Sequence, residues 1–409
     1  MLQFAAGEPK MVMRRLKTWY FVIEGVNSFV TTFFFYYLYF FMQARHGFDT
    51  KANLSLAAFT GLVYAIGSWL GGRFAQRAGY FTALKLGFSV MIGAILFGWA
   101  SDSGVARVCA MSVAVAGMCL TWPALEALVS ENESKAGIQH HVGIYNIVWA
   151  STGALAYFTG GALVEKLGAP GLFGLPVAIV SGLLALTLVL ERAASRPDAP
   201  RAHTVTAAVN EPDPAGHCPG ARAKTFLHMA WVANPFAYMA INTLVAAMPT
   251  VALRLELSPM EAGFYCSTWL FARVIAFGLL WAWPGWHYRA GWLFGAVALL
   301  IASFAIILTV PNLACVVAAQ LVFGSCTGLI YYSSLFYAMD LGETKGEHGG
   351  LHEAAIGAGN CAGPLVGAAA LQFLPQYAHS GAIAVSVLLL AGFGALVFIW
   401  RRRANVAQP

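Results

Sequence analysis

The chain has 409 residues, of which 59% are hydrophobic and only 10% are charged. Soluble domains typically carry about 25% charged residues, so this composition excludes an ordinary soluble domain and indicates a membrane protein. The formal net charge is +6, but no soluble segment carries a clustered basic face. We therefore expect no binding to nucleic acid.

Twelve stretches are apolar and long enough to cross a membrane, since a helix needs roughly 20 apolar residues to span a hydrocarbon core about 30 Å thick. They cover approximately residues 19–42, 54–75, 81–100, 105–128, 142–164, 171–190, 226–253, 263–284, 291–310, 313–337, 351–374 and 380–400. The sequence therefore predicts an all-α, multi-pass membrane protein with twelve transmembrane helices.

The chain divides into two similar halves around one long polar stretch. Residues 191–225 are rich in Pro, Ala and Arg and are typical of a flexible linker, which predicts units of 1–190 and 226–409. Arg77-Ala78-Gly79-Tyr80 follows the second segment of the first half, and Arg289-Ala290-Gly291-Trp292 stands at the corresponding point of the second half. Two pseudo-symmetric six-helix bundles are expected, an arrangement that favours transport.

Basic residues are distributed unevenly between the loops on the two sides of the membrane. A cytoplasmic N-terminus places 18 Lys and Arg residues on the cytoplasmic side and five on the other, while Arg273 falls within a span. This asymmetry follows the positive-inside rule. We expect a plasma (inner) membrane protein with both termini and the linker in the cytoplasm.

The first segment contains a polar stripe around an acidic residue. Asn27, Ser28 and Thr31 lie three, four and seven positions after Glu24, so all four share one face of a helix. A charge at the centre of a membrane helix costs about 2.5–3.5 kcal/mol and tends to face a partner or a wet cavity. Glu24 is a candidate carrier of a coupling proton, and a structural salt bridge is the alternative. Further along, the aromatic run 33–41 predicts lipid-facing and interfacial side chains.

The loop after the second segment carries a partial motif, Gly72-Arg73-Phe74-Ala75-Gln76-Arg77-Ala78-Gly79-Tyr80. With the twelve spans and the central linker, it makes the whole chain resemble the major facilitator superfamily. Gly72, Arg77 and Gly79 match that family's signature, whereas Gln76 replaces the expected Asp. The glycines are expected to allow a close approach to the eleventh helix and a tight turn.

The resemblance implies a cytoplasmic latch built from an Asp–Arg pair, which Gln76 cannot complete. Glu126 and Glu353, near the ends of the fourth and eleventh segments, are expected to pair with Arg73 and Arg77 instead. The candidate gating residues are Gly72, Arg73, Gln76, Arg77, Gly79, Glu126 and Glu353.

Arg107, near the outer end of the fourth segment, approximates the position of an arginine that the family uses in proton coupling. An arginine that extends to the membrane interface is the alternative, because Met111 stands where the family has a glycine.

The family's drug/proton antiporters carry a Gly-Pro motif in helix 5. Here Thr152, Ala156, Tyr157, Gly160 and Gly161 lack the Gly-Pro step, which Gly363-Pro364 retains in the eleventh segment. This departure makes a drug antiporter a weaker interpretation.

Arg273 lies ten residues into the eighth segment and is poorly placed to reach either surface. A guanidinium held in a cavity can bind a carboxylate or phosphate by two parallel hydrogen bonds. Internal pairing with an acidic residue such as Glu24 is the alternative. The remaining candidates for contact with substrate are Asn27, Thr31, Asn146, Trp149, Tyr238, Asn242, Gln320, Tyr331 and Asn360.

The leading functional hypothesis is a secondary transporter, a proton symporter for a small polar or anionic organic solute. A multidrug or metabolite efflux antiporter is the alternative. The sequence has no Walker motif and no His-Glu-x-x-His or Gly-x-Ser-x-Gly motif, so we expect neither ATP hydrolysis nor an embedded enzyme. No cysteine or histidine spacing suggests a metal. We expect no metal or other cofactor, and a monomer in the bilayer.

Overall fold

The computed structural model describes residues 9–131, 135–195, 220–341, 347–377 and 379–406, and these residues contain helices and no β-strand. The all-α prediction is therefore confirmed. The helices are α1 (Pro9–His46), α2 (Thr50–Ala78), α3 (Tyr80–Ala100), α4 (Gly104–Ser130), α5 (Lys135–Ala169), η1 (Pro170–Gly174), α6 (Leu175–Ala194), α7 (Gly220–Arg254), α8 (Pro259–Cys266), α9 (Thr268–Ala282), η2 (Pro284–Trp286), α10 (Ala290–Thr309), α11 (Leu313–Asp340), α12 (Glu347–Phe373) and α13 (Ser380–Val406).

Eleven helical stretches among the described residues are long and apolar enough to cross a membrane. The longest, His140–Ala194, has 55 residues and contains both the fifth and the sixth expected segments. Gly168 interrupts it with the non-helical angles φ 59° and ψ −140°. Length and hydropathy thus support a multi-pass membrane protein, and the count of twelve crossings stays a prediction.

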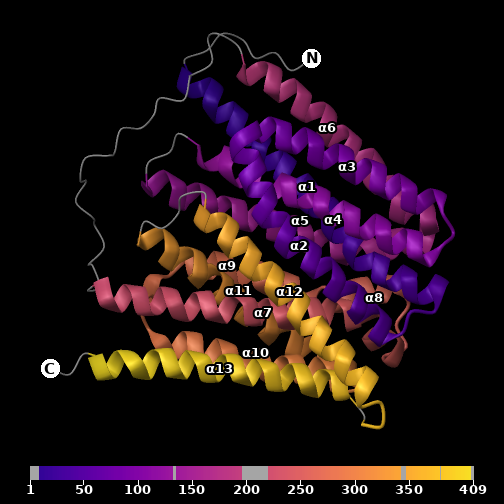
Figure 1. The fold of residues 1–409 in the computed structure, drawn as a ribbon, viewed down its shortest axis with the longest axis vertical. Coiled ribbons are helices and arrows are strands. Elements are labelled where there is room, and N and C mark those ends of the chain that lie inside the picture. Colours follow the sequence, from indigo (N-terminus) through magenta and orange to yellow (C-terminus); the bar gives the residue numbers. More distant parts are fainter. Residues whose placement is uncertain (1–8, 132–134, 196–219, 342–346, 378, 407–409) are drawn as a thin grey trace.

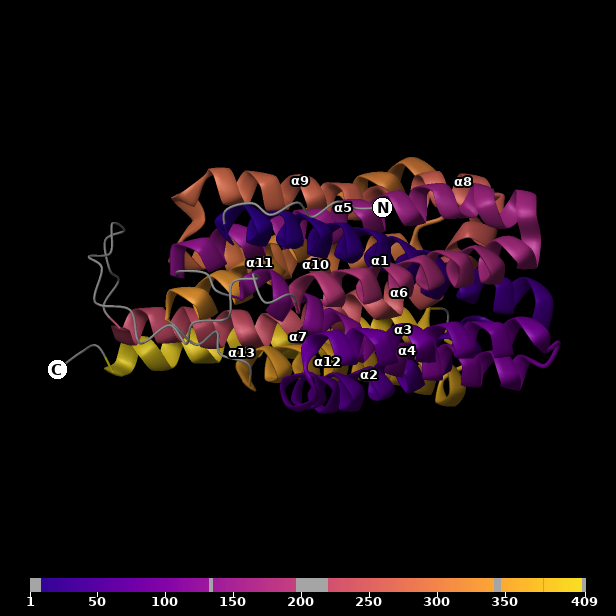
Figure 2. The same ribbon diagram turned by 90° about the horizontal axis from the view of Figure 1, so that it is seen from above.

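The helices of the two halves of the chain occupy different parts of the molecule. Figure 1 shows α1, α3 and α6 toward one side and α10 and α13 at the other, with α2, α5, α7 and α12 between them. Two seams join the halves: α2 packs along α12, and α5 packs along α8 and α9. Figure 2 shows these seams at opposite edges of the molecule. The proposed unit boundaries stay a prediction, and linker residues 196–219 lie outside the described part.

Small residues bring α2 and α12 together, but not at the position that the sequence motif indicated. A Cβ atom on Gly61 would lie 2.5 Å from the backbone carbonyl carbon of Asn360, and one on Gly357 would lie 2.4 Å from the Cα atom of Ala65. A Cβ on Gly72 would meet no atom within 4 Å. The expectation that Gly72 permits the close approach is therefore wrong, because the helices touch about three turns earlier along α2.

The two copies of the Arg-Ala-Gly-aromatic sequence differ in conformation. Gly79 has a φ of 92° and separates α2 from α3, which confirms the tight turn expected there. Gly291 instead lies in the first turn of α10, and Tyr288 supplies the left-handed residue with a φ of 54°. The internal repeat is thus preserved in position more than in backbone geometry.

The aromatic run of α1 is buried or half-buried throughout, which corrects the expectation that it faces lipid. Phe33 and Tyr37 have no exposed surface, and Tyr39 is 2% exposed. The Tyr37 ring fills the space beside Gly160 of α5, where a Cβ atom would collide with it, and its hydroxyl donates to the Tyr157 carbonyl. Because α1 packs against α4, α5, α6 and α7, it has little surface left for lipid.

Candidate functional site

A cavity of about 200 Å³ lies between the two halves of the chain. Helices α1, α2, α4 and α5 line it from one side, and α7, α9, α11 and α12 line it from the other. Its polar and charged walls include Glu24, Ser28, Thr31, Thr32, Thr60, Glu126, Asn242, Arg273, Glu353 and Asn360. Its aromatic walls are Phe35, Tyr36, Tyr39, Tyr64, Trp122, Tyr145, Trp149, Tyr238 and Tyr331.

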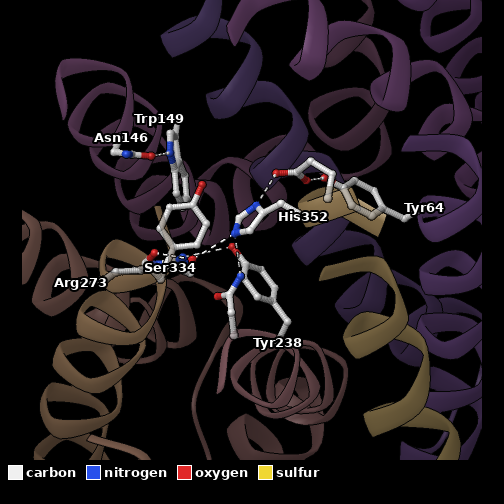
Figure 3. A network of polar contacts seen from close by, with 10 residues as sticks. Tyr64, Asn146, Trp149, Tyr238, Arg273, Ser334 and His352 are labelled. Carbon is white, nitrogen blue, oxygen red and sulfur yellow. Dashed lines mark hydrogen bonds and ion pairs between the residues drawn. The ribbon is translucent and has the colours of Figure 1, made fainter. Parts of the chain in front are cut away.

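Arg273 reaches this cavity from α9 and is held there by aromatic rings. Its Nη2 atom donates to the Tyr238 hydroxyl at 3.2 Å, as Figure 3 shows. The guanidinium carbon lies 4.8 Å from the centre of the Trp149 ring and 5.0 Å from that of Tyr331. The side chain belongs to a residue that is 3% exposed, and its Nε atom has no hydrogen-bond partner. Among the described residues, no carboxylate lies within 4.0 Å of Arg273.

Glu24 lies on the α1 wall of the same cavity. The residue is 1% exposed, and its Oε2 atom has no hydrogen-bond partner. The Tyr145 side chain hydrogen-bonds to the Glu24 carboxyl group, and the carboxyl group of Glu126 interacts with it electrostatically. The structure therefore does not form the Glu24–Arg273 ion pair that the sequence left open, and no other basic side chain of the described residues lies within 4.0 Å of Glu24.

Glu353 belongs to a polar network that joins the halves. Its Oε2 atom accepts a hydrogen bond from the Tyr64 hydroxyl of α2 at 2.5 Å, and its Oε1 atom lies 3.8 Å from Nδ1 of His352. The Nε2 atom of His352 lies 3.0 Å from the Ser334 hydroxyl and 3.1 Å from Nδ2 of Asn234. Figure 3 shows His352 between Arg273 on one side and Tyr64 on the other. This network ties α2 to α7, α11 and α12.

Glu126 is the third acidic residue of the cavity. It is half-buried on α4, one turn after Trp122, whose ring packs edge-on against Tyr64. Among the described residues, none forms a hydrogen bond or ion pair with its carboxylate. The Trp122 Nε1 atom likewise has no partner.

The structure brings most of the candidate substrate contacts to this cavity: Thr31, Trp149, Tyr238, Asn242, Arg273, Tyr331 and Asn360 line it. Several of them also have structural partners. The Asn242 side chain donates to the Asn360 carbonyl at 2.7 Å, and the Thr31 hydroxyl donates to the Asn27 carbonyl at 2.8 Å.

Three candidate amides do not line the cavity, because neighbouring groups already engage them. Asn27 donates to the Thr121 hydroxyl at 3.3 Å and ties α1 to α4. Asn146 accepts from Trp149 Nε1 at 2.9 Å and orients that ring. Gln320 donates to the Tyr265 carbonyl at 3.1 Å. Polar side chains within a membrane commonly find such partners on nearby helices.

Arg107 also lies away from the cavity, at the start of α4. It is 4% exposed, contacts His46 and lies 3.5 Å from an oxygen of Asp102. Its guanidinium carbon lies 4.8 Å from the centre of the Phe41 ring. Arg107 therefore does not line the cavity, and its part in proton coupling stays a prediction.

The expected latch pairs are not formed in this structure. Arg73 and Arg77 are exposed, as is Gln76, and Arg73 stacks on Trp69 at 4.1 Å. Glu126 and Glu353 face the cavity instead. The two arginines are on the exposed surface whereas the two carboxylates line the cavity, so the side chains do not meet.

Sequence reasoning missed Tyr64, Trp122, Tyr145 and His352. Tyr145 lies one turn before Trp149, so helical spacing from a recognised candidate was a signal that could have identified it. Trp122 stands in the same relation to Glu126. Tyr64 and His352 had no comparable signal, because their importance comes from a contact between α2 and α12.

The described residues contain no group of three or more His, Cys, Asp or Glu side chains that could hold a metal ion. The three carboxylates of the cavity therefore line one space without gathering at metal-ligand distances.

Comparisons by sequence found no matching family model and no matching curated protein. Solved structures do match. A bacterial homologue of the human lysosomal transporter Spinster, in an inward-facing and unoccupied conformation, is 13% identical with a TM-score of 0.63, and the match covers 98% of this chain and 96% of that one. The nucleoside transporter NupG is 13% identical with a TM-score of 0.64, covering 96% and 99%. A POT family transporter in complex with 5-aminolevulinic acid is 13% identical with a TM-score of 0.70, covering 95% and 96%.

These similar structures are all membrane transporters, and the matches span nearly the whole of each chain. The protein has the fold of the transporters of the major facilitator superfamily. Identities of this size establish the fold and do not transfer a substrate.

Proposed function

We propose that the protein is a secondary active transporter that moves a small polar or anionic organic solute by alternating access, as a proton symporter. The observation that carries this proposal is the cavity between the two halves, which contains an uncompensated acidic group and a buried guanidinium. Pseudo-symmetric halves that rock about such a site expose it to each side in turn. Arg273 is the proposed contact for an anionic group.

Glu24 is the proposed proton carrier. A buried carboxylate without a cationic partner is costly in its charged form, and a carboxyl group can exchange that charge for a proton. Glu24 lies in the cavity with a free Oε2 atom. Proton binding at this position would change the charge that the substrate meets, which is the requirement for coupling.

The proposal includes twelve crossings in two six-helix bundles, with both termini at the cytoplasmic face of the plasma membrane and a monomer as the working unit. The kink at Gly168 supports two crossings within the longest stretch. Hydrogen bonds between the halves gather near the α1–α2 and α7–α8 turns: Thr50 with Thr250 at 2.8 Å, and the Met260 amide with Glu165 at 2.9 Å. With the proposed orientation, these contacts close the outer side of the cavity.

The test begins with a thermal-stability screen of the purified protein against small organic solutes, because a ligand raises the melting temperature. The stabilising solute is then offered to proteoliposomes with an imposed pH gradient. Glu24→Gln should abolish accumulation against a concentration gradient while exchange across the membrane continues. Glu256→Gln is the matched control, since Glu256 is exposed in the turn between α7 and α8. Full proton-driven accumulation by Glu24→Gln would show that Glu24 is structural.

The aromatic walls of the cavity favour one competing function, a multidrug or metabolite efflux antiporter. Such a protein discriminates poorly among apolar ligands. Stabilisation by many unrelated aromatic cations, together with export driven by an inward proton gradient, would support that function over uptake of a defined polar solute.

A further inference from the structure

The cavity is lined by more acidic than basic side chains, and the proposed function leaves two of the acidic ones without a role. Glu24, Glu126 and Glu353 line the cavity, whereas Arg273 is the one basic side chain among the described residues that line it. If Glu24 carries the proton and Arg273 binds an anionic group, the carboxylates of Glu126 and Glu353 have no assigned function. Their placement indicates what else the substrate carries.

These two carboxylates come from different halves of the chain and have aromatic rings beside them. Glu126 comes from α4, with Trp122 one turn away, and Glu353 comes from α12, with the Tyr64 hydroxyl bound to it at 2.5 Å. The rings of Trp122 and Tyr64 are 6.2 Å apart. Carboxylates together with aromatic faces suit an organic ammonium group, which is attracted both by negative charge and by the faces of rings. An inorganic ion is disfavoured, because the described residues contain no cluster that could hold a metal.

Two of the charged residues that line the cavity each have a buried polar atom without a hydrogen-bond partner. Glu24 Oε2 and Arg273 Nε belong to residues that are 1% and 3% exposed, and neither atom has a partner. Buried polar atoms are normally hydrogen-bonded, so an unpartnered one needs an explanation such as a ligand. Two residues that line one cavity, one acidic and one basic, therefore each retain an unsatisfied polar atom.

Glu353 and Arg273 lie on different sides of the polar network. Figure 3 shows Arg273 and Tyr64 at opposite sides of the polar network, with His352 between them. Tyr64 is bound to Glu353, so Glu353 belongs to the side opposite Arg273. No carboxylate among the described residues approaches Arg273 to within 4.0 Å, and the opposite charges therefore do not neutralise each other by direct contact.

We infer that the substrate is a small zwitterionic organic solute, whose ammonium group binds between Glu126 and Glu353 and whose anionic group binds Arg273. This inference rests on the proposed transport function and narrows its substrate class. It requires each charged group of the ligand to depend on a different part of the site.

The experiment measures binding to the purified full-length protein by the rise in melting temperature. The probes are glycine, β-alanine, γ-aminobutyrate and ε-aminocaproate, which place the two charges at increasing separation. Each is compared with its N-acetyl derivative, which lacks the positive charge, and with its methyl ester, which lacks the negative one. At least one zwitterion should stabilise the protein, and both of its derivatives should bind about tenfold or more weakly, as expected for loss of a charged hydrogen bond.

Variants then assign each charge of the ligand to its place in the site. Glu126→Gln should weaken the zwitterion and its methyl ester about tenfold and leave the N-acetyl derivative unaffected. Glu353→Gln, which keeps an acceptor for Tyr64, should give the same pattern and serves if the first variant folds poorly. Arg273→Gln should weaken the zwitterion and the N-acetyl derivative but not the ester. Glu256→Gln is the control and should change none of these affinities.

The inference is overturned if an N-acetyl derivative binds as well as its parent, or if no amine-bearing probe stabilises the protein. Binding needs no gradient, so this result is independent of the transport test. Ammonium-dependent binding without proton-driven uptake would refute only the coupling mechanism, and proton-driven uptake of a purely anionic solute would refute only the zwitterion.

Discussion

Arg273 and Glu24 should act independently of each other in the stability of the protein. They lie in one cavity, but the structure forms no ion pair between them. A double-mutant cycle with Arg273→Ala and Glu24→Gln measures the coupling between the two residues in the free energy of unfolding. If the residues do not interact directly, their effects should add within about 0.3–0.5 kcal/mol.

The size of the Arg273→Ala effect follows from its contacts. The substitution removes one hydrogen bond from a charged donor to Tyr238, which contributes about 1.5–3 kcal/mol. It also removes the contacts with Trp149 and Tyr331, at about 0.5–2 kcal/mol each. The relief of burying an unpaired charge offsets part of this loss. We therefore expect a folded variant destabilised by about 1–3 kcal/mol.

A broken buried ion pair gives a different result. Removal of one partner costs about 3–5 kcal/mol because the other charge stays buried, and the double variant then recovers stability. Unfolding in a fixed detergent can be followed with a thiol-reactive fluorophore, since Cys119 and Cys266 are free and buried. The Tyr64→Phe and Glu353→Ala cycle is the positive control, because each substitution removes one side of a hydrogen bond whose two oxygens are 2.5 Å apart. A coupling energy of roughly 1.5–3 kcal/mol is expected. Recovery of more than about 1.5 kcal/mol in the Arg273→Ala, Glu24→Gln variant would refute the independence of the two residues.

Two further predictions concern packing and pH. Gly61→Ala should destabilise the protein by about 1–3 kcal/mol, because its Cβ atom would lie 2.5 Å from the Asn360 backbone. Gly93→Ala in α3 should be neutral or stabilising by up to about 1 kcal/mol, since a Cβ atom there meets nothing within 4 Å. Equal melting temperatures for the two variants would contradict this prediction. Burial lowers the pKa of His287 from its ordinary value of 6.5, and the negative charge of Asp340 offsets part of this shift. The His287 ring stacks on Phe336 with ring centroids 3.9 Å apart. His287 therefore takes up a proton at higher pH in the unfolded chain than in the folded protein. The contribution of the neutral His287 ring to the free energy of unfolding is present above about pH 6.5 and is lost as the pH falls. His287→Gln should flatten the dependence of melting temperature on pH between about 7 and 5, and an unchanged slope would exclude His287 as its source.

The spacing of polar residues along single helices correctly predicted the location of part of the site. Glu24 and Thr31 were identified as one face of α1, and both line the cavity. Arg273 was identified as an isolated charge far from either surface, and it is 3% exposed. These inferences needed only the helical period and the cost of a charge in lipid.

Sequence alone determined the membrane class, the all-helical fold, the approximate position of nearly every span and the turn at Gly79. It could not determine how each helix is rotated against its neighbours. The rotation of the helices placed Glu126 and Glu353 in the cavity and left Arg73 and Arg77 exposed. It also brought the side-chain amides of Asn27, Asn146 and Gln320 into hydrogen bonds with nearby groups. The period of a helix fixes which residues share a face, but the partner of that face is set by packing between segments far apart in the chain. The contact of Tyr64 with Glu353, 289 positions away, was therefore decided by the tertiary structure.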